Sequence, residues 1–469
     1  MNLVRTATDA LGGFLWGPPM LAVFLLTGAY LTARSRAFPL RRAGLWLRST
    51  FGTLLKKQQA AEGSITQRQA LASALAACLG TGNIIGVTTA LSLGGPGAVF
   101  WMWVSAALGM MTCCTENILG VKYRWRANSG GWMGGPMAYL EKGLGSKTLA
   151  GIYAALLALA SFGIGNMTQA NAIAEAAKQS FSFNIPGWIV GILVAALIGF
   201  VIFGGVGRIA QVTEKIVPAM AGLFLLASGI VLIKNHRAIP GALGLIVREA
   251  FALPSAAGGM AGYGIAKAMR YGIARGVFSN EAGLGSSAVV HAAADVKDPA
   301  VQGMWGIAEV FIDTLLMCTV TALVLLCSGA WQSGNQGVAM ASAAFTGVFG
   351  RWGTHFVSIS IALFAFATLT GWSFYGEQGV RYLLGEKSVK AYRALYLGAI
   401  VLGCAARLET VWAAADVLNG LMALPNLLGV VVLGGQAVRE LRSWERAAPS
   451  RISLRFPRRF PGQSDRRFE

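Results

Sequence analysis

Charged residues are scarce in this chain of 469 residues, because Lys, Arg, Asp and Glu make up only 13% of it while 55% is hydrophobic. A soluble domain usually carries about 25% charged residues. The length would suit about three soluble domains, but too little charge is present to cover their surfaces. The 61 glycines suit closely packed membrane helices better than a soluble core. The composition therefore predicts one polytopic membrane domain.

The sequence patterns of common hydrolases and metalloenzymes are also missing. There is no HExxH, GxSxG or phosphate-loop pattern, and His236, His291 and His355 are far apart in the sequence. These observations give no support for a metal centre or an intramembrane enzyme, so we expect a protein that is not an enzyme. The six cysteines lie in or beside apolar segments and are expected to be small core residues: Cys78, Cys113, Cys114, Cys318, Cys327 and Cys404.

Acidic residues are few beside basic ones, since 20 Asp and Glu stand against 39 Lys and Arg, a net charge of +19. The cations gather between apolar segments, as the positive-inside rule expects. No basic folded surface remains once those segments are set aside, so nucleic acid is not an expected partner. Membrane lipid is, particularly anionic lipid near the basic tail. No obligatory protein partner is inferred.

Apolar segments of about 20 residues, long enough to cross a bilayer, recur eleven times. The first, residues 14–33, is longer than the apolar part of a signal peptide. With the N-terminus outside and the C-terminus cytoplasmic, the most basic loops fall on the cytoplasmic side. We therefore predict a multi-pass protein of the cell inner (plasma) membrane. The segments centre near Leu25, Gly82, Ala107, Ala158, Leu197, Leu223, Ser279, Leu315, Phe364, Ile400 and Leu421.

Two of these segments contain glycine-rich, polar interruptions, namely GTGNIIG (residues 80–86) and FSNEAGLGSS (residues 278–287). Each interruption opens a set of five segments once the first segment is left out, which indicates an inverted repeat. The expected organisation is a transmembrane domain and a basic cytoplasmic tail. The domain covers residues 1–435 and the tail residues 436–469. Within the domain we expect a peripheral first helix (14–33), a first five-helix repeat (68–235) and a second five-helix repeat (262–435).

An interrupted membrane helix has a physical cost that points to a ligand. Unpaired backbone groups are costly in hydrocarbon and are tolerated only where they line a cavity or meet a partner. The freed N–H groups favour a carboxylate, and the freed carbonyls favour a hard cation such as Na⁺. Two structural alternatives stay open: a close helix crossing through Gly82 and Gly86, and a cytoplasmic loop for residues 278–287.

Polar side chains in other apolar segments are candidates for the same site. Gln169 in the fourth segment has the alternative of an interhelical hydrogen bond, and Asn171 points to another side of that helix. Thr368 and Thr370 in the ninth segment offer hydroxyl groups for a cation or a substrate. Trp372 is suited to limit a small pocket, with packing as the alternative.

Acidic residues within apolar segments are candidates for binding a proton. Glu116 and Asp313 are candidates for a proton relay. Asp416 is interpreted mainly as a structural polar latch, with a cation or proton site as the alternative. Glu377 is expected to be solvated near the cytoplasmic end of its segment.

The motifs GTGNIIGV, GNMTQANAIA, FSNEAGLGSS with VVHAAA, GWSFYGE and VWAAADVLNGLMALPN together resemble those of the alanine-or-glycine:cation symporter family, whose members are also called sodium:alanine symporters or amino acid carrier proteins. The resemblance covers residues 68–433. It implies an all-α polytopic membrane protein with a leucine-transporter-type 5+5 inverted repeat and one extra N-terminal transmembrane helix, about eleven spans in all.

The family resemblance also implies a function and a set of site residues. The function is secondary active symport, in which inward sodium movement drives uptake of a small neutral amino acid, alanine or glycine, by alternating access. The alternatives are a proton-coupled amino acid carrier of the same fold, a channel, and a structural or receptor protein. The implied substrate residues are Thr81, Gly82, Asn83, Gln169, Asn171, Asn280, Thr368, Gly371 and Trp372, with sodium near Cys78, Gly80, Thr368 and Thr370.

Overall fold

The computed structural model describes residues 11–54, 59–127, 130–180, 185–252, 264–406 and 408–453, and nearly all of them are helical. Within these ranges the only strands are β1 (Trp125–Arg126) and β2 (Trp132–Met133), which pair antiparallel with Trp125 opposite Met133. The first residues of the expected second repeat and the end of the expected tail lie outside the described residues. The all-α class that the family resemblance implies is confirmed.

Seven helices or helix runs are long and apolar enough to cross a membrane by length and composition. They are the run Leu11–Arg34, which contains α2 (Pro18–Arg34), α7 (Gly97–Lys122), α9 (Lys147–Phe162) with η4 (Gly163–Met167) and α10 (Thr168–Ser180), α12 (Gly205–Lys234), α16 (Pro299–Val310) with η7 (Phe311–Cys318) and α17 (Thr319–Cys327), α19 (Trp352–Leu384), and the part Ala415–Ala447 of α21 (Leu408–Ser453). The segments η4 and η7 are π-helical turns inside longer helices, a feature that is frequent at functional sites.

The other four expected segments form helices that are either shorter or interrupted. Two are the short helices α11 (Gly187–Ile202) and α20 (Val389–Ala405). Two are broken into α5 (Gln67–Cys78) with α6 (Ile85–Gly94), and α14 (Gly264–Asn280) with α15 (Ser287–His291). Further short helices are α3 (Phe38–Arg41), α4 (Ala43–Ser49), α8 (Pro136–Ala138), α13 (Ile239–Ala250) and α18 (Gly337–Phe349).

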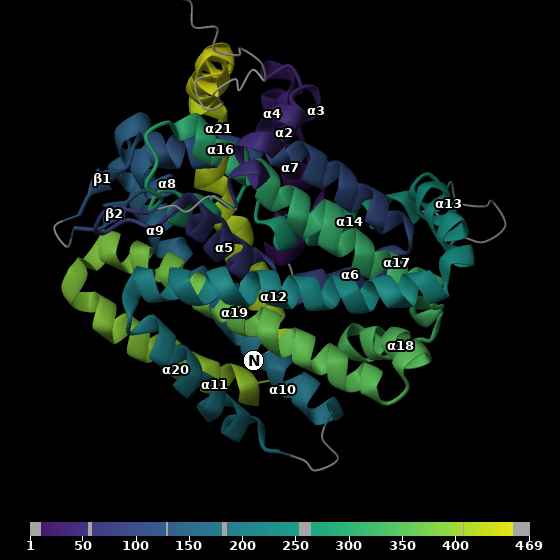
Figure 1. Ribbon diagram of the computed structural model, residues 1–469. Helices are drawn as coiled ribbons and strands as arrows, with labels where there is room; N and C mark the ends of the chain where they lie inside the picture. The colour runs from purple at the N-terminus through teal and green to yellow at the C-terminus, as the bar shows by residue number, and fades with distance from the viewer. Residues whose placement is uncertain are drawn as a thin grey trace, which may run out of the picture.

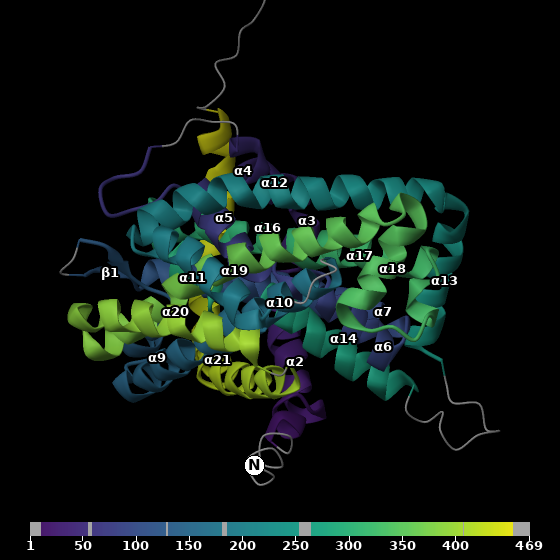
Figure 2. The same ribbon diagram turned by 90° about the horizontal axis from the view of Figure 1, so that it is seen from below.

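Helices that are far apart in the sequence pack in pairs. The helix α7 packs against α16, α9 and α10 pack against α19, and α11 packs against α20. Figures 1 and 2 show α11 and α20 side by side at the edge of the bundle. The broken helix α5–α6 meets α14 in the interior. Each pair joins one helix of the expected first repeat to the corresponding helix of the expected second repeat.

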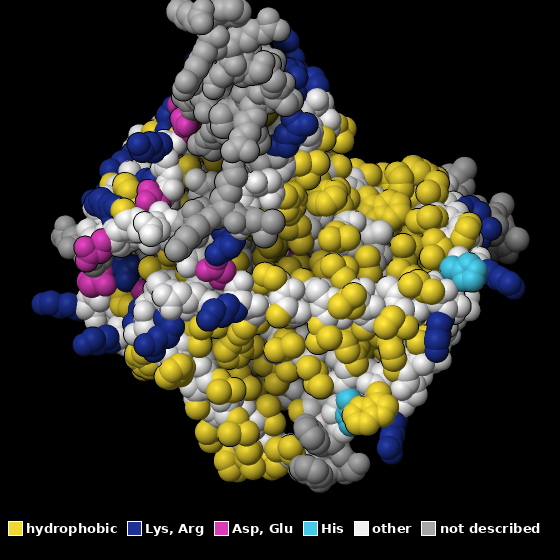
Figure 3. Space-filling model, viewed as in Figure 1, with side chains coloured by type: hydrophobic (Ala, Val, Ile, Leu, Met, Phe, Trp, Pro, Cys, Tyr) yellow, Lys and Arg dark blue, Asp and Glu magenta, His cyan; other side chains and the backbone are white. Residues whose placement is uncertain are grey.

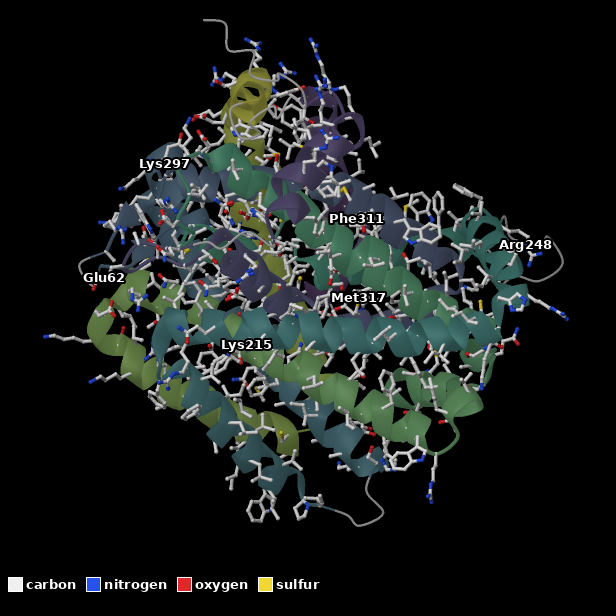
Figure 4. All side chains as sticks on the ribbon, viewed as in Figure 1. Glu62, Lys215, Arg248, Lys297, Phe311 and Met317 are labelled. Atoms are coloured by element: carbon white, nitrogen blue, oxygen red, sulfur yellow. The ribbon has the colours of Figure 1, made fainter. Side chains whose placement is uncertain are left out.

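The surface of the molecule is apolar in its middle and charged toward its ends. Figure 3 shows hydrophobic side chains over most of the visible face, with Lys and Arg gathered near β1, β2, α3 and α4. In Figure 4, Glu62 and Lys297 lie at one end and Arg248 at the other, with Phe311 and Met317 between them. Large exposed apolar side chains on α11, α12 and α20 include Leu193, Phe200, Leu226, Ile233, Leu395 and Leu402. Such a surface fits a lipid environment, as expected for a multi-pass membrane protein.

The expectation that Glu377 is solvated is wrong. Only 6% of its side chain is exposed, and it pairs with Arg381 at 2.7 Å and with Arg393 at 2.8 Å. The two guanidinium groups, one from the same helix and one from α20, compensate the buried carboxylate.

Candidate functional site

The first helix break lies between α5 and α6, as the GTGNIIG motif predicts. The helix α5 starts with a capping box of Thr66 and Gln69 and ends at Cys78. Gly80 is extended, Thr81–Asn83 form a single 3₁₀ turn, and α6 begins at Ile85. A Cβ atom on Gly80 would lie 2.5 Å from Thr368 Oγ1 and 3.3 Å from Gln169 Oε1. Only glycine allows α19 and α10 to approach the backbone this closely.

The second break lies between α14 and α15, which the sequence also predicts. Glu281, Gly283 and Gly285 all have positive φ angles, of 57°, 94° and 76°. Such angles suit glycine and are uncommon for a residue such as Glu281. A Cβ atom on Gly285 would lie 2.5 Å from Asn426 Oδ1, so packing as well as conformation requires a glycine there. The whole segment 281–286 is buried.

The two breaks meet inside the molecule, through Asn83, Ser279 and Asp313. The Asn83 amide donates to Ser279 Oγ at 3.2 Å and to Asp313 Oδ1 at 2.7 Å. Ser279 Oγ in turn donates to Asp313 Oδ1 at 3.1 Å. All three side chains are at most 1% exposed. The carboxylate on η7 therefore connects both interruptions in one buried polar group.

Gln169 forms the wall of the first break on the side of α10. Its Oε1 atom accepts a hydrogen bond from the Thr81 backbone N–H at 3.2 Å, and its Nε2 donates to the Ile164 carbonyl at 3.0 Å. It thus holds an N–H that the break has freed. Thr81 Oγ1 and Asn83 Oδ1 are buried and have no hydrogen-bond partner among the described residues. Buried polar atoms nearly always have one, so these two oxygens point to a ligand.

Thr368 and Gly371 bring α19 against the end of α5. Thr368 Oγ1 donates to the Ala76 carbonyl at 3.0 Å, and a Cβ atom on Gly371 would lie 3.0 Å from the Ala77 nitrogen. The carbonyl of Cys78 is close by in the chain and accepts from the Gly80 N–H at 2.8 Å. Oxygen atoms of this kind are the ligands that hard cations prefer.

Trp372 joins α19 to the second break. Its Nε1–H donates to Glu281 Oε1 at 2.8 Å, and Ser286 donates to the other carboxylate oxygen. Gly165 in η4 makes room for the indole, because a Cβ atom there would lie 2.3 Å from Trp372 Cβ. Trp372 therefore packs between the π-helical turn η4 and the break, with its polar edge on a buried acid.

The structure does not bring three of the expected residues into this group. Asn171 donates to the Gly403 and Ala406 carbonyls at 3.0 and 2.8 Å, because two helical positions turn it away from Gln169. Thr370 is turned from Thr368 in the same way, and its hydroxyl donates to the Phe366 carbonyl of its own helix at 2.8 Å. Asn280 is the last residue of α14, where its Nδ2 donates to Thr314 Oγ1 and its Oδ1 accepts from the Ala282 N–H, both at 3.0 Å.

A group of side chains that sequence reasoning did not assign to the site supports the second break. Glu116 on α7 accepts from the Gly283 N–H at 3.1 Å and from Asn426 Nδ2 at 2.5 Å. Asn426 also donates to the Gly283 carbonyl at 2.8 Å, and Tyr153 donates to the Leu284 carbonyl at 2.9 Å. The freed backbone groups are thus satisfied by side chains. An acid and an amide inside apolar segments were the only signals for Glu116 and Asn426.

A cavity of about 400 Å³ lies beside the first break, between α6, α10, α14 and the start of α18. Arg275 lines it and pairs with Asp416 on α21 at 3.2 Å. This ion pair agrees with the interpretation of Asp416 as a polar latch. At the other end of the broken helix, Glu214 on α12 pairs with Arg68 and accepts from Gln69 Nε2 at 2.9 Å.

These features together define a class of protein: a multi-pass helical membrane protein whose two interrupted helices meet in the interior, as in secondary transporters. A sequence profile of the sodium:alanine symporter family matches residues 1–456. The chain belongs to this family, which confirms the resemblance inferred from its motifs. Its relatives are transporters, so the protein is a membrane transporter and not an enzyme.

Three relatives illustrate the range of the family. The sodium/alanine symporter AgcS of Methanococcus maripaludis is 40% identical over 95% of this chain and 97% of its own length. The probable sodium/glutamine symporter GlnT of Bacillus subtilis is 36% identical over 95% and 91%. The putative sodium/proton-dependent alanine carrier protein YrbD of the same organism is 33% identical over 93% and 92%.

Proposed function

We propose that the protein is a secondary active symporter that couples inward sodium movement to uptake of a small neutral amino acid, alanine or glycine. The observation that carries this proposal is the meeting of the two helix breaks beside the unpartnered oxygens Thr81 Oγ1 and Asn83 Oδ1. Leaving such oxygens without partners is unfavourable. The ammonium group of an amino acid or a sodium ion would satisfy them.

The fold proposed for this function is the 5+5 inverted repeat with one extra N-terminal helix, eleven spans in all. The pairing of α7 with α16, of α9 and α10 with α19, and of α11 with α20 supports it, as does the position of one break at the start of each set. The proposed orientation has the N-terminus outside and the C-terminus in the cytoplasm.

The proposed substrate site lies at the first break. The substrate carboxylate would lie near Gly82 and the start of α6, where the helix N-terminus favours a negative charge. Gln169 and Asn83 are the nearby polar side chains, and Trp372 would limit the space for the substrate side chain. A bulkier substrate such as glutamine would require Trp372 to move.

The proposed sodium site lies between the end of α5 and α19. The Thr368 hydroxyl and the backbone oxygens of Cys78 and Gly80 would supply its ligands, since a hard cation prefers oxygen. Thr370 would not join them in this arrangement, because it lies on the other side of α19 and its hydroxyl donates to the Phe366 carbonyl. The sodium ion would also compensate the carbonyls that the break leaves at the end of α5.

Alternating access would require the side-chain contacts at the two ends of the broken helices to open in turn. Glu214 holds the start of α5 to α12, together with the Ser73–Thr213 hydroxyl contact at 3.0 Å. The cavity beside Arg275 lies at the opposite end of the break. With the proposed orientation, this arrangement closes the cytoplasmic side and leaves a hollow toward the outside.

Uptake of labelled alanine into liposomes containing the purified protein tests the proposal. We expect an inward sodium gradient to drive accumulation above the external concentration, and potassium to fail in its place. The panel would include glycine, serine, glutamine and D-alanine. Accumulation that is equal with and without a sodium gradient would remove the sodium claim.

A second candidate is a proton-coupled carrier of the same fold. Asp313 and Glu281 favour it, because both are buried acids in direct contact with a break residue or with Trp372. Uptake driven by a pH gradient in the absence of sodium would support this candidate over the first.

A further inference from the structure

A buried histidine and glutamate form a pair outside the site described above. His291 is the last residue of α15, and Glu309 lies near the end of α16. His291 Nε2 lies 3.0 Å from Glu309 Oε2, and both side chains are 0% exposed. Two titratable groups in contact without solvent are costly when they carry a net charge, so the proton occupancy of the pair matters for its stability.

Gln302 determines which ring nitrogen of His291 carries the proton. Its Nε2 amide lies 2.5 Å from His291 Nδ1. Because an amide nitrogen can only donate, Nδ1 accepts, and the imidazole proton lies on Nε2 and points to Glu309. The histidine is therefore neutral, and Glu309 Oε2 accepts from it as a carboxylate oxygen. The pair in this form carries one negative charge.

Two oxygen atoms at this pair have no hydrogen-bond partner among the described residues, namely Gln302 Oε1 and Glu309 Oε1. A half-turn of the Gln302 amide would exchange its nitrogen and oxygen, so that Oε1 could accept from a protonated Nδ1. Alternatively, Glu309 Oε1 could itself take the proton. In both cases one added proton makes the pair neutral overall, and in the first case Gln302 Oε1 also gains a donor.

Apart from His291, the ionisable groups that interact with Glu309 among the described residues are acids, thiols or phenols. They are Cys78 on α5, Cys113 and Glu116 on α7, Glu281 in the second break, Asp313 on η7 and Tyr375 on α19. Cys113 Sγ also donates to Glu309 Oε2 at 3.7 Å. None of these groups brings a positive charge to balance the glutamate, so a proton is the cation that this arrangement favours.

The chain reaches the protein surface within four residues of His291. Asp295, four residues after His291, is exposed. Arg124 donates to the carbonyls of Ala292 and Ala294, both at 2.6 Å, and to that of Val296 at 2.9 Å. Burial lowers the pKa of Arg124 to about 10, which leaves it charged at neutral pH. The carbonyls directly after His291 are thus held at the end of the molecule where α5 begins.

From this arrangement we infer that His291 and Glu309 form a proton-binding site, filled from the side of the protein where α5 begins. The pair takes up one proton from water, on Nδ1 of His291 or on Oε1 of Glu309, and Gln302 rotates to accept from the imidazolium in the first case. Because the pair joins α15, the second half of a broken helix, to α16, proton binding changes how firmly these helices are joined. Only the effect on transport rests on the proposed symport function.

Infrared difference spectroscopy of the full-length protein in lipid tests the binding site directly. A pH step is expected to give a band of a protonated carboxyl or of an imidazolium that is lost in both Glu309→Gln and His291→Gln. His236→Gln, at an exposed histidine, is the matched control and keeps the band. A spectrum that is unchanged in either pair variant overturns the inference.

If the His291 and Glu309 variants do not fold, the Gln302→Leu variant provides a second test of the proton-binding site. It removes the acceptor for the protonated imidazole, so the midpoint of the band is expected to move to lower pH. An unchanged midpoint in a folded Gln302→Leu protein would overturn protonation at Nδ1 of His291. Because no sodium or amino acid is present in these measurements, failure of the proposed symport leaves their outcome unaffected. In proteoliposomes, the dependence of alanine exchange on internal pH should weaken in Glu309→Gln.

Discussion

Asn83 of the first helix break donates a 2.7 Å hydrogen bond to Asp313, a residue 230 positions further along the chain. Through this contact and the neighbouring Ser279, a single carboxylate holds two interrupted helices together. The arrangement gives this buried acid a structural role, because its Oδ1 atom accepts from donors on both helices.

Asp313→Asn is expected to reduce sodium-driven alanine uptake by about 10-fold or more. A hydrogen bond to a charged group contributes about 1.5–3 kcal/mol, and 1.4 kcal/mol corresponds to about a factor of ten. The measurement is the initial uptake rate per folded protein. Glu62→Gln, at an exposed acid before α5, is the control and should transport normally. Wild-type rates in Asp313→Asn would show that this carboxylate does not organise the site.

Gly80→Ala is expected to abolish transport. The new Cβ atom would lie 2.5 Å from Thr368 Oγ1, so α19 would have to move away from the break. Gly86→Ala is a matched control in α6, since a Cβ atom there meets nothing within 4 Å. Both variants are compared by uptake and by thermal unfolding. Equal activity of the two would contradict the close approach of α19 to Gly80.

Gln169→Ala and Trp372→Ala are expected to weaken transport without unfolding the protein. Removing Gln169 leaves the Thr81 N–H without its acceptor, a loss of about 1–3 kcal/mol and hence roughly a tenfold higher KM. Trp372→Phe keeps most of the ring but removes the donor to Glu281, and it should lie between wild type and Trp372→Ala. Either alanine variant with normal kinetics would remove that residue from the site.

Glu214→Gln is expected to shift the protein toward a form that is open where α5 begins. The substitution removes the charge that pairs with Arg68 and accepts from Gln69. A cysteine introduced at Ala70 reports the opening, because this residue is fully buried beside the contacts of Glu214. The measured quantity is the rate at which the cysteine reacts with a thiol reagent. Faster labelling in Glu214→Gln is the expected result. An unchanged rate would show that these contacts do not control access.

Glu377 and Glu386 offer a comparison of a buried and an exposed ion pair on the same arginine. Both bind Arg381, but the Glu377 side chain is 6% exposed and that of Glu386 is 53% exposed. Glu377→Gln is expected to destabilise the protein by about 3–5 kcal/mol, because it leaves Arg381 and Arg393 poorly compensated. Glu386→Gln should cost about 0–1 kcal/mol. Thermal unfolding in detergent measures both, and equal shifts would contradict the account.

The sequence predicted the two breaks because glycine and an unpaired amide are rare inside apolar segments, and both breaks lie where GTGNIIG and FSNEAGLGSS place them. Helical periodicity also anticipated that Asn171 points away from Gln169. The same rule separates Thr370 from Thr368, although both were assigned to the sodium site. A two-residue step on a helix turns a side chain to the far side.

The partners of the breaks could not be predicted in this way. That Asp313 meets Asn83, or that Glu116 meets Gly283, depends on how helices far apart in the sequence pack. The left-handed conformation of Glu281, whose carboxylate accepts from Trp372 and Ser286, is likewise not a local preference of glutamate. The ion pairs of Glu377 require Arg393 from a different helix, which a single apolar segment does not reveal.

Binding of labelled alanine to the purified protein, with and without sodium, tests most directly whether the paired breaks form one site for both solutes. The account predicts saturable binding that requires sodium, is lost in Gly80→Ala and is retained in Gly86→Ala. Binding that is equally tight without sodium, or that survives in Gly80→Ala, would contradict it.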